Sequence, residues 1–345
     1  MTRTTIKDIA ADVGVSHTTV SYVLNRNPNQ KISAKTRQAV LEAAKRLNYV
    51  PNETARSLRS DSTKCIAVAL EKSIMRSRFY SILQGIREEL ITEGYGLLLM
   101  DFQARENSQR PDYLESVLKR KTDGIIYIAS DGQSPECSAS IAKSHIPFVS
   151  CDCCPEEEEL VSVSFDYEKG AFEVACRLFG EGSTKIIYWQ PDVDTFQEHY
   201  RMDGLKRAQQ LYPNTTLEFI KLPYISRHTI SEYDTSQIDN LCQQCLVQSI
   251  LPQLSNTSEN IAIICSWGIM VKHLCAALYQ KASFDCKIAL LSDADVPLIP
   301  GIKILTSRPR FFYGGKQSAK LLLSQIRKEG PVNNIVLDPE PPTYV

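Results

Sequence analysis

Residues 4–25 read TTIKDIAADVGVSHTTVSYVLN, and this stretch decides the fold of the N-terminal part of the chain. Apolar residues recur in it at i, i+3, i+4 and i+7, which is the spacing of one helix face: Ile6, Ile9, Ala10 and Val13. Gly14 follows, and glycine readily adopts the positive φ that a sharp corner between helices requires. Ser16 is suited to cap a second helix over residues 16–24. Two short helices joined at a glycine predict a helix-turn-helix.

The second helix has two different sides. Val20, Val23 and Leu24, again at i, i+3 and i+4, form an apolar side that we expect to point inward. The opposite side is polar and carries His17, Thr18, Ser21 and Tyr22. Two helices of a larger bundle are the alternative interpretation of this pattern.

A third helix is predicted over residues 33–45, and apolar residues close a small core against the first two: Val40, Ala43, Ala44 and Leu47. Pro51 disfavours helix at the residue before it, so the third helix ends earlier. Asn52 can cap a further helix over residues 53–59, which is too short to be stable alone in water. By composition alone, this last segment is a disordered linker.

The distribution of charge separates the N-terminal part from the rest. The chain has 345 residues, 43% of them hydrophobic, which suits two or three globular domains. Residues 1–60 contain ten Lys/Arg and four Asp/Glu, a balance of 10 − 4 = +6, whereas the remainder carries 29 − 36 = −7. A basic head on an acidic body, combined with a helix-turn-helix, indicates that the head binds nucleic acid.

Cysteine usage and hydropathy give no sign of secretion, a membrane or a metal. No apolar run approaches the roughly 18–20 residues of a membrane span, and the N-terminus lacks a signal peptide, so we expect a cytoplasmic protein. The eleven cysteines are scattered, and cytoplasmic thiols stay reduced. Two groupings lack the second pair that a zinc site needs: Cys151, Cys153 and Cys154, and Cys242 and Cys245. We therefore predict no metal and no cofactor.

From Cys65 onward the pattern alternates between strand and helix. Strands are predicted at residues 65–70, 95–100, 124–129, 146–152, 161–165, 185–189, 217–222, 260–265, 287–292 and 303–306. Helices are predicted at residues 79–90, 111–119, 167–179, 199–211, 236–251, 269–280 and 314–328. Such alternation implies parallel sheets covered on both faces, and some 280 residues of it suggest two similar lobes.

Residues that directly follow strands are candidates for a ligand site, because open α/β sheets bind ligands beyond the carboxyl ends of their strands. With two lobes, the natural site is a cleft between them. The candidates are Arg78, Phe79, Asp152, Ser266, Trp267, Asp293 and Asp295.

An enzyme on the same kind of sheet is the first rival hypothesis. The sequence contains no G-x-G-x-x-G, no Walker loop and no G-x-S-x-G elbow. The stretch GEGSTK at residues 180–185 runs from a helix into a strand, the reverse of a phosphate-binding loop. We therefore predict that the protein is not an enzyme.

The chain resembles the LacI/GalR-type bacterial transcription repressors along nearly its whole length. The motifs are TIKDIAADVGVSHTTVSYVLN, SAKTRQAVLEAAKRLNYVPN and ARSL at residues 55–58, with looser matches at Gly85-Ile86, Phe165-Asp166, Gly170 and Arg201-x-x-Gly204. The resemblance implies a lambda-repressor-like helix-turn-helix head at residues 1–50 and a hinge helix at residues 51–63. It further implies that residues 64–345 form a two-lobed α/β, periplasmic-binding-protein-like domain for effector binding and dimerisation.

The resemblance also implies how the head meets DNA. His17, Thr18 and Tyr22 match base-reading positions in the major groove, although the last position is usually arginine in the family. Ala55 and Leu58 match hinge positions in the minor groove, where an apolar wedge bends the duplex; for Leu58 the alternative is a contact with the large domain. The residues predicted to contact DNA are Thr5, Ser16, His17, Thr18, Thr19, Ser21, Tyr22, Asn25, Thr36, Asn52, Ala55 and Leu58.

For the effector, the resemblance implies a polar small molecule held between the lobes. Ser266-Trp267 replaces the usual Asn-Asp, and Ala294-Asp295 replaces an acidic pair, so a ligand-facing carboxylate is missing. Trp267 either stacks on the ligand or fills the gap. The predicted effector residues are Arg78, Phe79, Asp152, Gln197, Arg201, Tyr224, Ser266 and Trp267. The class of ligand stays open among a sugar, a sugar derivative and a nucleobase-like metabolite.

Together these observations predict a DNA-binding transcription regulator, a repressor. It would bind double-stranded, near-palindromic operator DNA as a homodimer and respond to a small-molecule effector. Nothing after residue 330 shows the leucine heptads of a tetramerisation helix, and no membrane is involved. A transcriptional activator with the same docking is the alternative, as is a ligand-binding receptor with a vestigial head.

Overall fold

The computed structural model describes residues 4–25, 30–50, 62–70, 77–101, 110–129, 135–153, 160–222, 236–254, 259–280, 286–297 and 299–345. Contacts divide the chain into two compact units, residues 1–63 and 64–345. Four of the predicted site residues lie outside the described residues: Asn52, Ala55, Leu58 and Tyr224.

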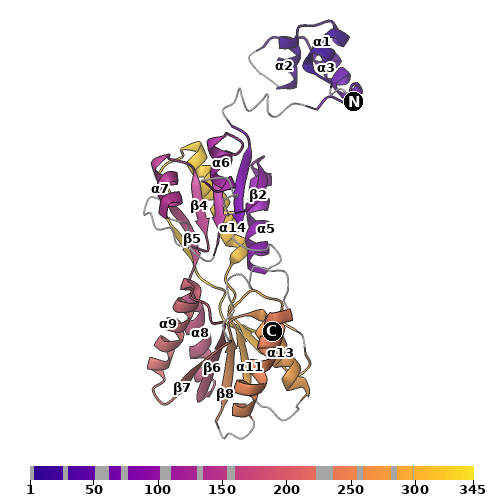
Figure 1. Cartoon of the computed structure of the whole chain (residues 1–345). Helices are drawn as coiled ribbons and strands as arrows, with labels where there is room; N and C mark the ends of the chain where they lie inside the picture. Colours follow the sequence, from indigo (N-terminus) through magenta and orange to yellow (C-terminus); the bar gives the residue numbers. More distant parts are fainter. Residues whose placement is uncertain are drawn as a thin grey trace. The chain divides into compact units, whose positions relative to one another are not determined.

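The described residues of the first unit form three short helices, as the periodicity predicts: α1 (Ile6–Val13), α2 (His17–Leu24) and α3 (Ala34–Arg46) (Figure 1). The Thr5 hydroxyl caps α1 and the Asp8 side chain accepts from the Thr5 amide, which completes a capping box. Gly14 has a φ of 73°, so the corner after α1 has the left-handed backbone that glycine favours. A small apolar core joins the helices: Ile9, Ala10, Val20, Val23, Val40, Ala43 and Ala44.

The second unit has two lobes, each built on a six-stranded sheet. The sheet of lobe 1 is parallel, in the order β11-β5-β4-β3-β1-β2. Its strands are β1 (Cys65–Leu70), β2 (Gly96–Asp101), β3 (Ile125–Ile128), β4 (Phe148–Cys151), β5 (Val161–Phe165) and β11 (Ile335–Leu337). Its helices are α5 (Ser77–Thr92), α6 (Asp112–Leu118), α7 (Pro135–Lys143) and α14 (Phe311–Arg327).

The sheet of lobe 2 has the order β12-β10-β9-β8-β6-β7. Its strands are β6 (Lys185–Gln190), β7 (Thr216–Lys221), β8 (Ile261–Cys265), β9 (Lys287–Leu290), β10 (Ile304–Thr306) and β12 (Thr343–Tyr344). Its helices are α8 (Tyr167–Gly180), α9 (Phe196–Leu211), α11 (Ser236–Cys245), a π-helical turn η1 (Leu246–Ile250), α12 (Leu251–Leu254) and α13 (Gly268–Gln280). The chain passes between the lobes three times: from β5 to α8, from β10 to α14 and from β11 to β12. The predicted fold class is thus confirmed.

The structure corrects several predicted boundaries. The helix predicted from residue 199 begins at Phe196, and the helix predicted from residue 314 begins at Phe311. Helix α7 and the short strands β11 and β12 were not predicted, and β12 pairs antiparallel to β10. The helix predicted over residues 236–251 is interrupted by the η1 turn.

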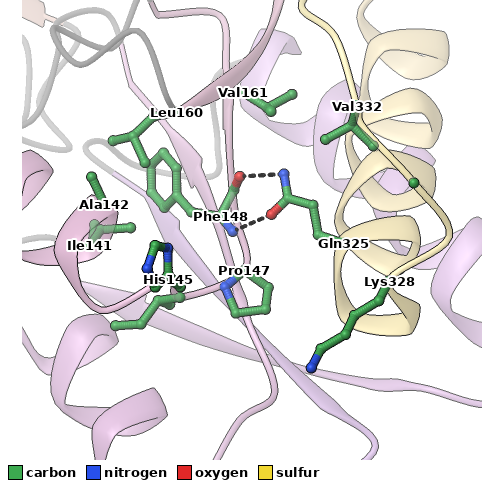
Figure 2. Close-up of a pocket in the computed structure, with 12 residues that line it drawn as sticks. Ile141, Ala142, His145, Pro147, Phe148, Leu160, Val161, Gln325, Lys328 and Val332 are labelled. Atoms are coloured by element: carbon green, nitrogen blue, oxygen red, sulfur yellow. Dashed lines mark hydrogen bonds between the residues drawn. The ribbon is translucent and has the colours of Figure 1, made fainter.

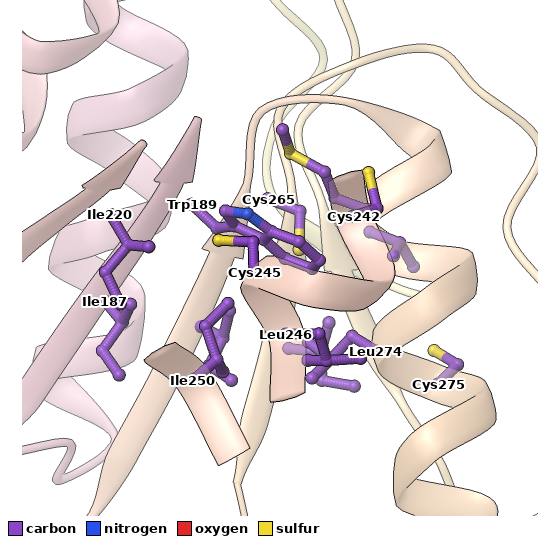
Figure 3. Packing of buried hydrophobic residues seen from close by; sticks show 14 of the residues in the cluster. Ile187, Trp189, Ile220, Cys242, Cys245, Leu246, Ile250, Cys265, Leu274 and Cys275 are labelled. Carbon is purple, nitrogen blue, oxygen red and sulfur yellow. The ribbon is translucent and has the colours of Figure 1, made fainter. Parts of the chain in front are cut away.

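Cysteines belong to the apolar core of lobe 2. Cys242, Cys245, Cys265 and Cys275 are buried in the same cluster as Trp189, and Figure 3 shows Cys245 next to the indole ring. Burial raises the pKa of Cys242 to about 12 and that of Cys275 to about 11, so these thiols stay protonated and unreactive at neutral pH. Among the described residues, no group of three or more His, Cys, Asp or Glu side chains could hold a metal ion. Every helix in the described ranges is too short or too polar to cross a lipid bilayer.

Candidate functional site

The polar side of α2 is the candidate DNA-binding surface of the head. His17 and Thr18 are exposed, whereas Val20 and Val23 on the other side are buried in the core. Tyr22 is half-buried. The Ser16 hydroxyl accepts from the Thr19 amide at 3.1 Å and caps α2. The sequence therefore separates the two sides of this helix correctly, with one exception.

The exception is Ser21, which we predicted on the exposed polar side. Ser21 is only 9% exposed, and its hydroxyl accepts from the Asn25 side-chain amide at 3.3 Å. Ser21 lies one turn before Asn25, which is itself exposed, and it joins that side chain to the helix. Ser21 thus supports the Asn25 side chain, and its own contact with DNA stays a prediction.

Two other residues predicted to contact DNA, Thr5 and Thr36, lie at the N-termini of helices. Thr5 caps α1, and Thr36 lies in the first turn of α3, where its amide donates to Ser33 at 3.1 Å. Thr5 is exposed and Thr36 is half-buried. Helix N-termini present free amides and a partial positive charge, which suits phosphate oxygens.

Between the lobes of the second unit lies a group of polar residues that we call the inter-lobe cluster, all buried except the half-buried Arg78: Arg78, Asp152, Tyr167, Tyr188, Gln197, Glu198, Arg201 and Ser266. Asp152 follows β4 and Ser266 follows β8, at the carboxyl ends of strands in the two sheets. Arg78 comes from α5, Tyr167 begins α8, and α9 supplies the residues from Gln197 to Arg201. The parallel topology thus brings these side chains together where ligands of such sheets bind.

Asp152 is the centre of one half of the cluster. Its side chain is fully buried, its Oδ1 accepts from Tyr167 at 2.6 Å, and its Oδ2 lies 2.9 Å from Arg78 Nη1. The Gln197 amide donates to the Asp152 backbone carbonyl at 3.2 Å, which joins α9 of lobe 2 to lobe 1. Asp152 has a φ of 63°, a left-handed conformation that aspartate tolerates better than most residues.

Arg201 is the centre of the other half. Its Nη1 donates to Glu198 at 2.6 Å and to Ser266 at 3.1 Å, and its Nη2 donates to the Leu291 carbonyl at 3.0 Å. The guanidinium lies 4.8 Å from the ring centroid of Tyr167, a distance at which cation–π attraction operates. Arg201 is therefore held from three directions before any ligand is considered.

Burial dominates the electrostatics of the cluster. It raises the pKa of Asp152, although the Arg78 charge works in the opposite direction. Burial also raises the pKa of Tyr167 well above its usual value, with the Asp152 charge adding to the effect. For Arg201, burial lowers the pKa, because it disfavours the charged form. The Glu198 carboxylate raises the pKa by more and keeps the guanidinium protonated.

A second connection between the lobes involves Asp293, which follows β9. Its two carboxylate oxygens accept from Ser77 and Ser81 of α5, each at 2.9 Å. Asp293 was among the residues predicted from their place after a strand. The connection joins the carboxyl edge of the lobe 2 sheet to the first helix of lobe 1.

Two of the predicted effector residues pack against the cores of the lobes. Phe79 is fully buried in the core of lobe 1, and its ring centroid lies 4.6 Å from the Arg78 guanidinium; its contact with a ligand stays a prediction. Trp267 is partly buried and packs against the core of lobe 2, which favours gap filling over stacking on a ligand. Asp295 is exposed.

Sequence reasoning missed Tyr167, Tyr188 and Glu198. The prediction that the site lacks a carboxylate is incomplete, because Glu198 is buried to 3% exposure beside Arg201. The available signal was the i, i+3 spacing of a glutamate and an arginine on a helix that has few apolar residues.

A cavity of about 500 Å³ lies elsewhere, in lobe 1 (Figure 2). Phe148 and Val161, at the amino ends of β4 and β5, line it together with the end of α14. The Gln325 amide donates to and accepts from the Phe148 backbone, at 3.0 and 2.8 Å. The cavity is at the opposite ends of the strands from Asp152, so it is separate from the inter-lobe cluster.

Comparison with known proteins agrees with this architecture. Residues 5–52 match the family model of bacterial regulatory proteins of the lacI family, and residues 63–212 match the model of periplasmic binding proteins and the sugar binding domain of the LacI family. The HTH-type transcriptional repressor PurR of Photobacterium profundum is 32% identical over 206 residues, 59% of this chain and 60% of that protein. Catabolite control protein A of Priestia megaterium is 31% identical over 205 residues, with the same coverage. The matches thus span about 60% of these relatives.

Solved structures share the fold over the whole chain. The Lac repressor dimer bound to operator and the anti-inducer ONPF superposes with a TM-score of 0.77 at 19% identity, covering 100% of this chain and 98% of that one. The complex of the transcriptional regulator CelR with cellobiose superposes with a TM-score of 0.60 at 19% identity, covering 99% and 98%. At such identities the likeness establishes the fold alone.

Proposed function

Because the chain belongs to the LacI family of bacterial regulatory proteins, we propose that it is a sequence-specific transcription regulator. It represses by binding a near-palindromic operator as a homodimer, and a small molecule held between the two lobes switches its affinity for DNA. The observation that carries the proposal is the two-sided helix α2, whose exposed His17 and Thr18 lie opposite a buried apolar side in a basic head.

The proposed contacts follow from chemistry. His17, Thr18 and Tyr22 reach base edges in the major groove, where each base pair displays its own pattern of donors and acceptors. Ser16, Thr19, Asn25, Thr5 and Thr36 bind phosphates and position the head, together with the ten Lys/Arg of residues 1–60. The names of the curated relatives, which include a transcriptional repressor, support repression over activation. With DNA as the partner, the protein acts in the cytoplasm. Its role is to bind DNA and not to catalyse a reaction.

Apolar residues on the surface of lobe 1 support the homodimer. Strand β2 is an edge strand that contacts both α5 and α6. These three elements carry exposed apolar side chains: Tyr80, Ile91, Leu98, Leu99 and Leu118. An exposed edge with apolar side chains is suited to pair with a second copy.

The test begins with selection of duplexes that the full-length chain retains from a random pool. Fluorescence anisotropy with a selected duplex then compares His17→Ala and Thr18→Ala with Gln38→Ala, an exposed residue of α3. We expect the two α2 variants to lose roughly tenfold or more in affinity for the selected duplex and to keep wild-type affinity for an unrelated duplex. Gln38→Ala should change neither.

The proposal fails if no duplex is retained at moderate salt by any form of the protein. It also fails if the α2 variants bind the selected duplex as tightly as Gln38→Ala does. Release of the selected duplex in a screen of sugars and nucleobases would identify the effector. Arg78, Asp152 and Gln197 are then the first residues to replace in a test of the response.

A further inference from the structure

We propose that Glu198 neutralises Arg201 and thereby makes the site between the lobes selective for uncharged, hydroxylated ligands. The inference rests on the proposed function, since it concerns the ligand of the same site. A buried arginine that is open to a ligand normally attracts anions such as phosphate and carboxylate. In this chain an internal carboxylate already takes that place.

The Glu198 carboxylate is fully engaged by donors. Its Oε1 accepts from Arg201 and from the Ser266 hydroxyl, and its Oε2 accepts from Tyr188 at 2.6 Å. All four side chains are buried. These three donors hold the Glu198 carboxylate in place beside Arg201.

The same arrangement works against an anionic ligand. A phosphate that approached Arg201 would meet the Glu198 carboxylate, which lies 2.6 Å from the guanidinium. Repulsion between like charges is large where water is excluded. Arg78 is likewise engaged by a group of the protein itself, because its Nη1 lies 2.9 Å from Asp152 Oδ2.

What the site offers is one donor and one acceptor. Within the described part of the chain, Arg201 Nε is a buried polar atom without a hydrogen bond, and Asp152 Oδ2, which pairs with Arg78, has a second lone pair that can accept. Their residues are linked through Tyr167, which bonds Asp152 and stacks against Arg201. A hydroxyl group both donates and accepts, so a ligand with neighbouring hydroxyls satisfies both atoms without adding charge.

The experiment uses the full-length chain and inorganic phosphate as the probe, with thermal unfolding as the readout at constant ionic strength. Glu198→Gln removes the charge and retains an acceptor for Arg201. Glu218→Gln is the matched control, because it also removes one negative charge from lobe 2 but pairs with the remote Lys185. We expect phosphate to raise the melting temperature of Glu198→Gln by about 3 °C more than that of the wild type or the control. The double variant Glu198→Gln, Arg201→Gln should lose this gain.

The inference is overturned if phosphate stabilises Glu198→Gln no more than Glu218→Gln. It is equally overturned if phosphate stabilises the wild type and Arg201→Gln abolishes that effect. Should Glu198→Gln not fold, Glu198→Ser takes its place under the same criteria. Tighter binding of ribose 5-phosphate than of ribose by the wild type, measured by calorimetry, would also contradict it. Operator affinity is measured separately, so a failure to bind DNA leaves this result standing.

Discussion

Gly204 lets α9 pack closely against α8, and replacing it tests how the inter-lobe cluster is held in place. A Cβ added at Gly204 would lie 2.2 Å from the Glu168 carbonyl oxygen and 3.0 Å from the Phe172 amide nitrogen. Ordinary non-bonded contact needs about 3.5 Å, so the two helices must separate by roughly 1 Å. Overpacking of this kind typically costs about 1–3 kcal/mol, which exceeds the gain in helix propensity of up to about 1 kcal/mol.

The chain offers a matched control in the same helix pair. A Cβ at Gly180, the last residue of α8, would lie 3.6 Å from its nearest neighbour, the Tyr212 hydroxyl. Gly180→Ala is therefore expected to leave the free energy of unfolding unchanged or to raise it by a few tenths of a kcal/mol. We expect Gly204→Ala to be less stable than Gly180→Ala by about 2 kcal/mol.

The assay is urea unfolding followed by tryptophan fluorescence. The chain has two tryptophans, Trp189 and Trp267, and both belong to lobe 2, so the signal reports the unfolding of that lobe. The reasoning is refuted if the urea midpoint of Gly204→Ala equals or exceeds that of Gly180→Ala. Because Arg201 lies one turn before Gly204 on α9, a destabilised variant should also lose its response to the effector.

Two further predictions concern a helix cap and a buried carboxyl. Thr5→Ala removes the capping box that Thr5 forms with Asp8 and should cost about 1 kcal/mol, seen as roughly fivefold faster amide exchange in α1; unchanged exchange would contradict it. Burial raises the pKa of Asp152, so the folded carboxyl keeps its proton to higher pH than the unfolded one, and wild-type stability falls as pH rises above about 4. The stability of Asp152→Asn does not fall with pH in this way, so its urea midpoint should rise relative to that of the wild type between pH 4 and 7. A difference between the two midpoints that is constant with pH would contradict the raised pKa of Asp152.

The head and the alternating strands could be predicted because local pattern and burial agree there. In α2, each apolar residue at helical spacing is turned toward the core, and Gly14 has the positive φ that its place at the corner demands. The strands of both sheets are short apolar runs, such as residues 185–190, because they are covered on both faces. In these segments the local pattern of apolar residues is sufficient to predict the helix or strand.

Other segments depend on distant parts of the chain. Helix α9 begins three residues before the predicted start. The prediction missed this first turn because Gln197, Glu198 and Arg201 are polar residues that are nevertheless buried. An apolar stripe cannot mark a helix that points polar side chains into a network between lobes. The strands β11 and β12 have three and two residues, too few for any periodicity, and they exist because an edge of each sheet is open to pairing.

The same dependence explains why the site was only partly predicted. Asp152 and Arg201 matched a family pattern. Their hydrogen-bond partners, Tyr167 and Glu198, stand at positions that no motif identifies. Their roles arise from the crossing of α8 and α9 beside the carboxyl ends of the strands. The residues of a site can therefore be identified from sequence before the electrostatic character of that site can.

The electrostatic character of the inter-lobe cluster affects how an effector can act. A ligand shifts a conformational equilibrium only by its difference in affinity for the two states. The bonds of Asp152 to Gln197 and of Asp293 to Ser77 join the lobes in the structure described. An effector that bonded to Asp152 and Arg201 would add its own contacts to these, or replace them, and the balance would determine whether the lobes stay together. Since the internal carboxylate already satisfies the charge of Arg201, that balance depends on hydrogen bonds, whose net contributions of about 1 kcal/mol each make the switch adjustable by single hydroxyl groups.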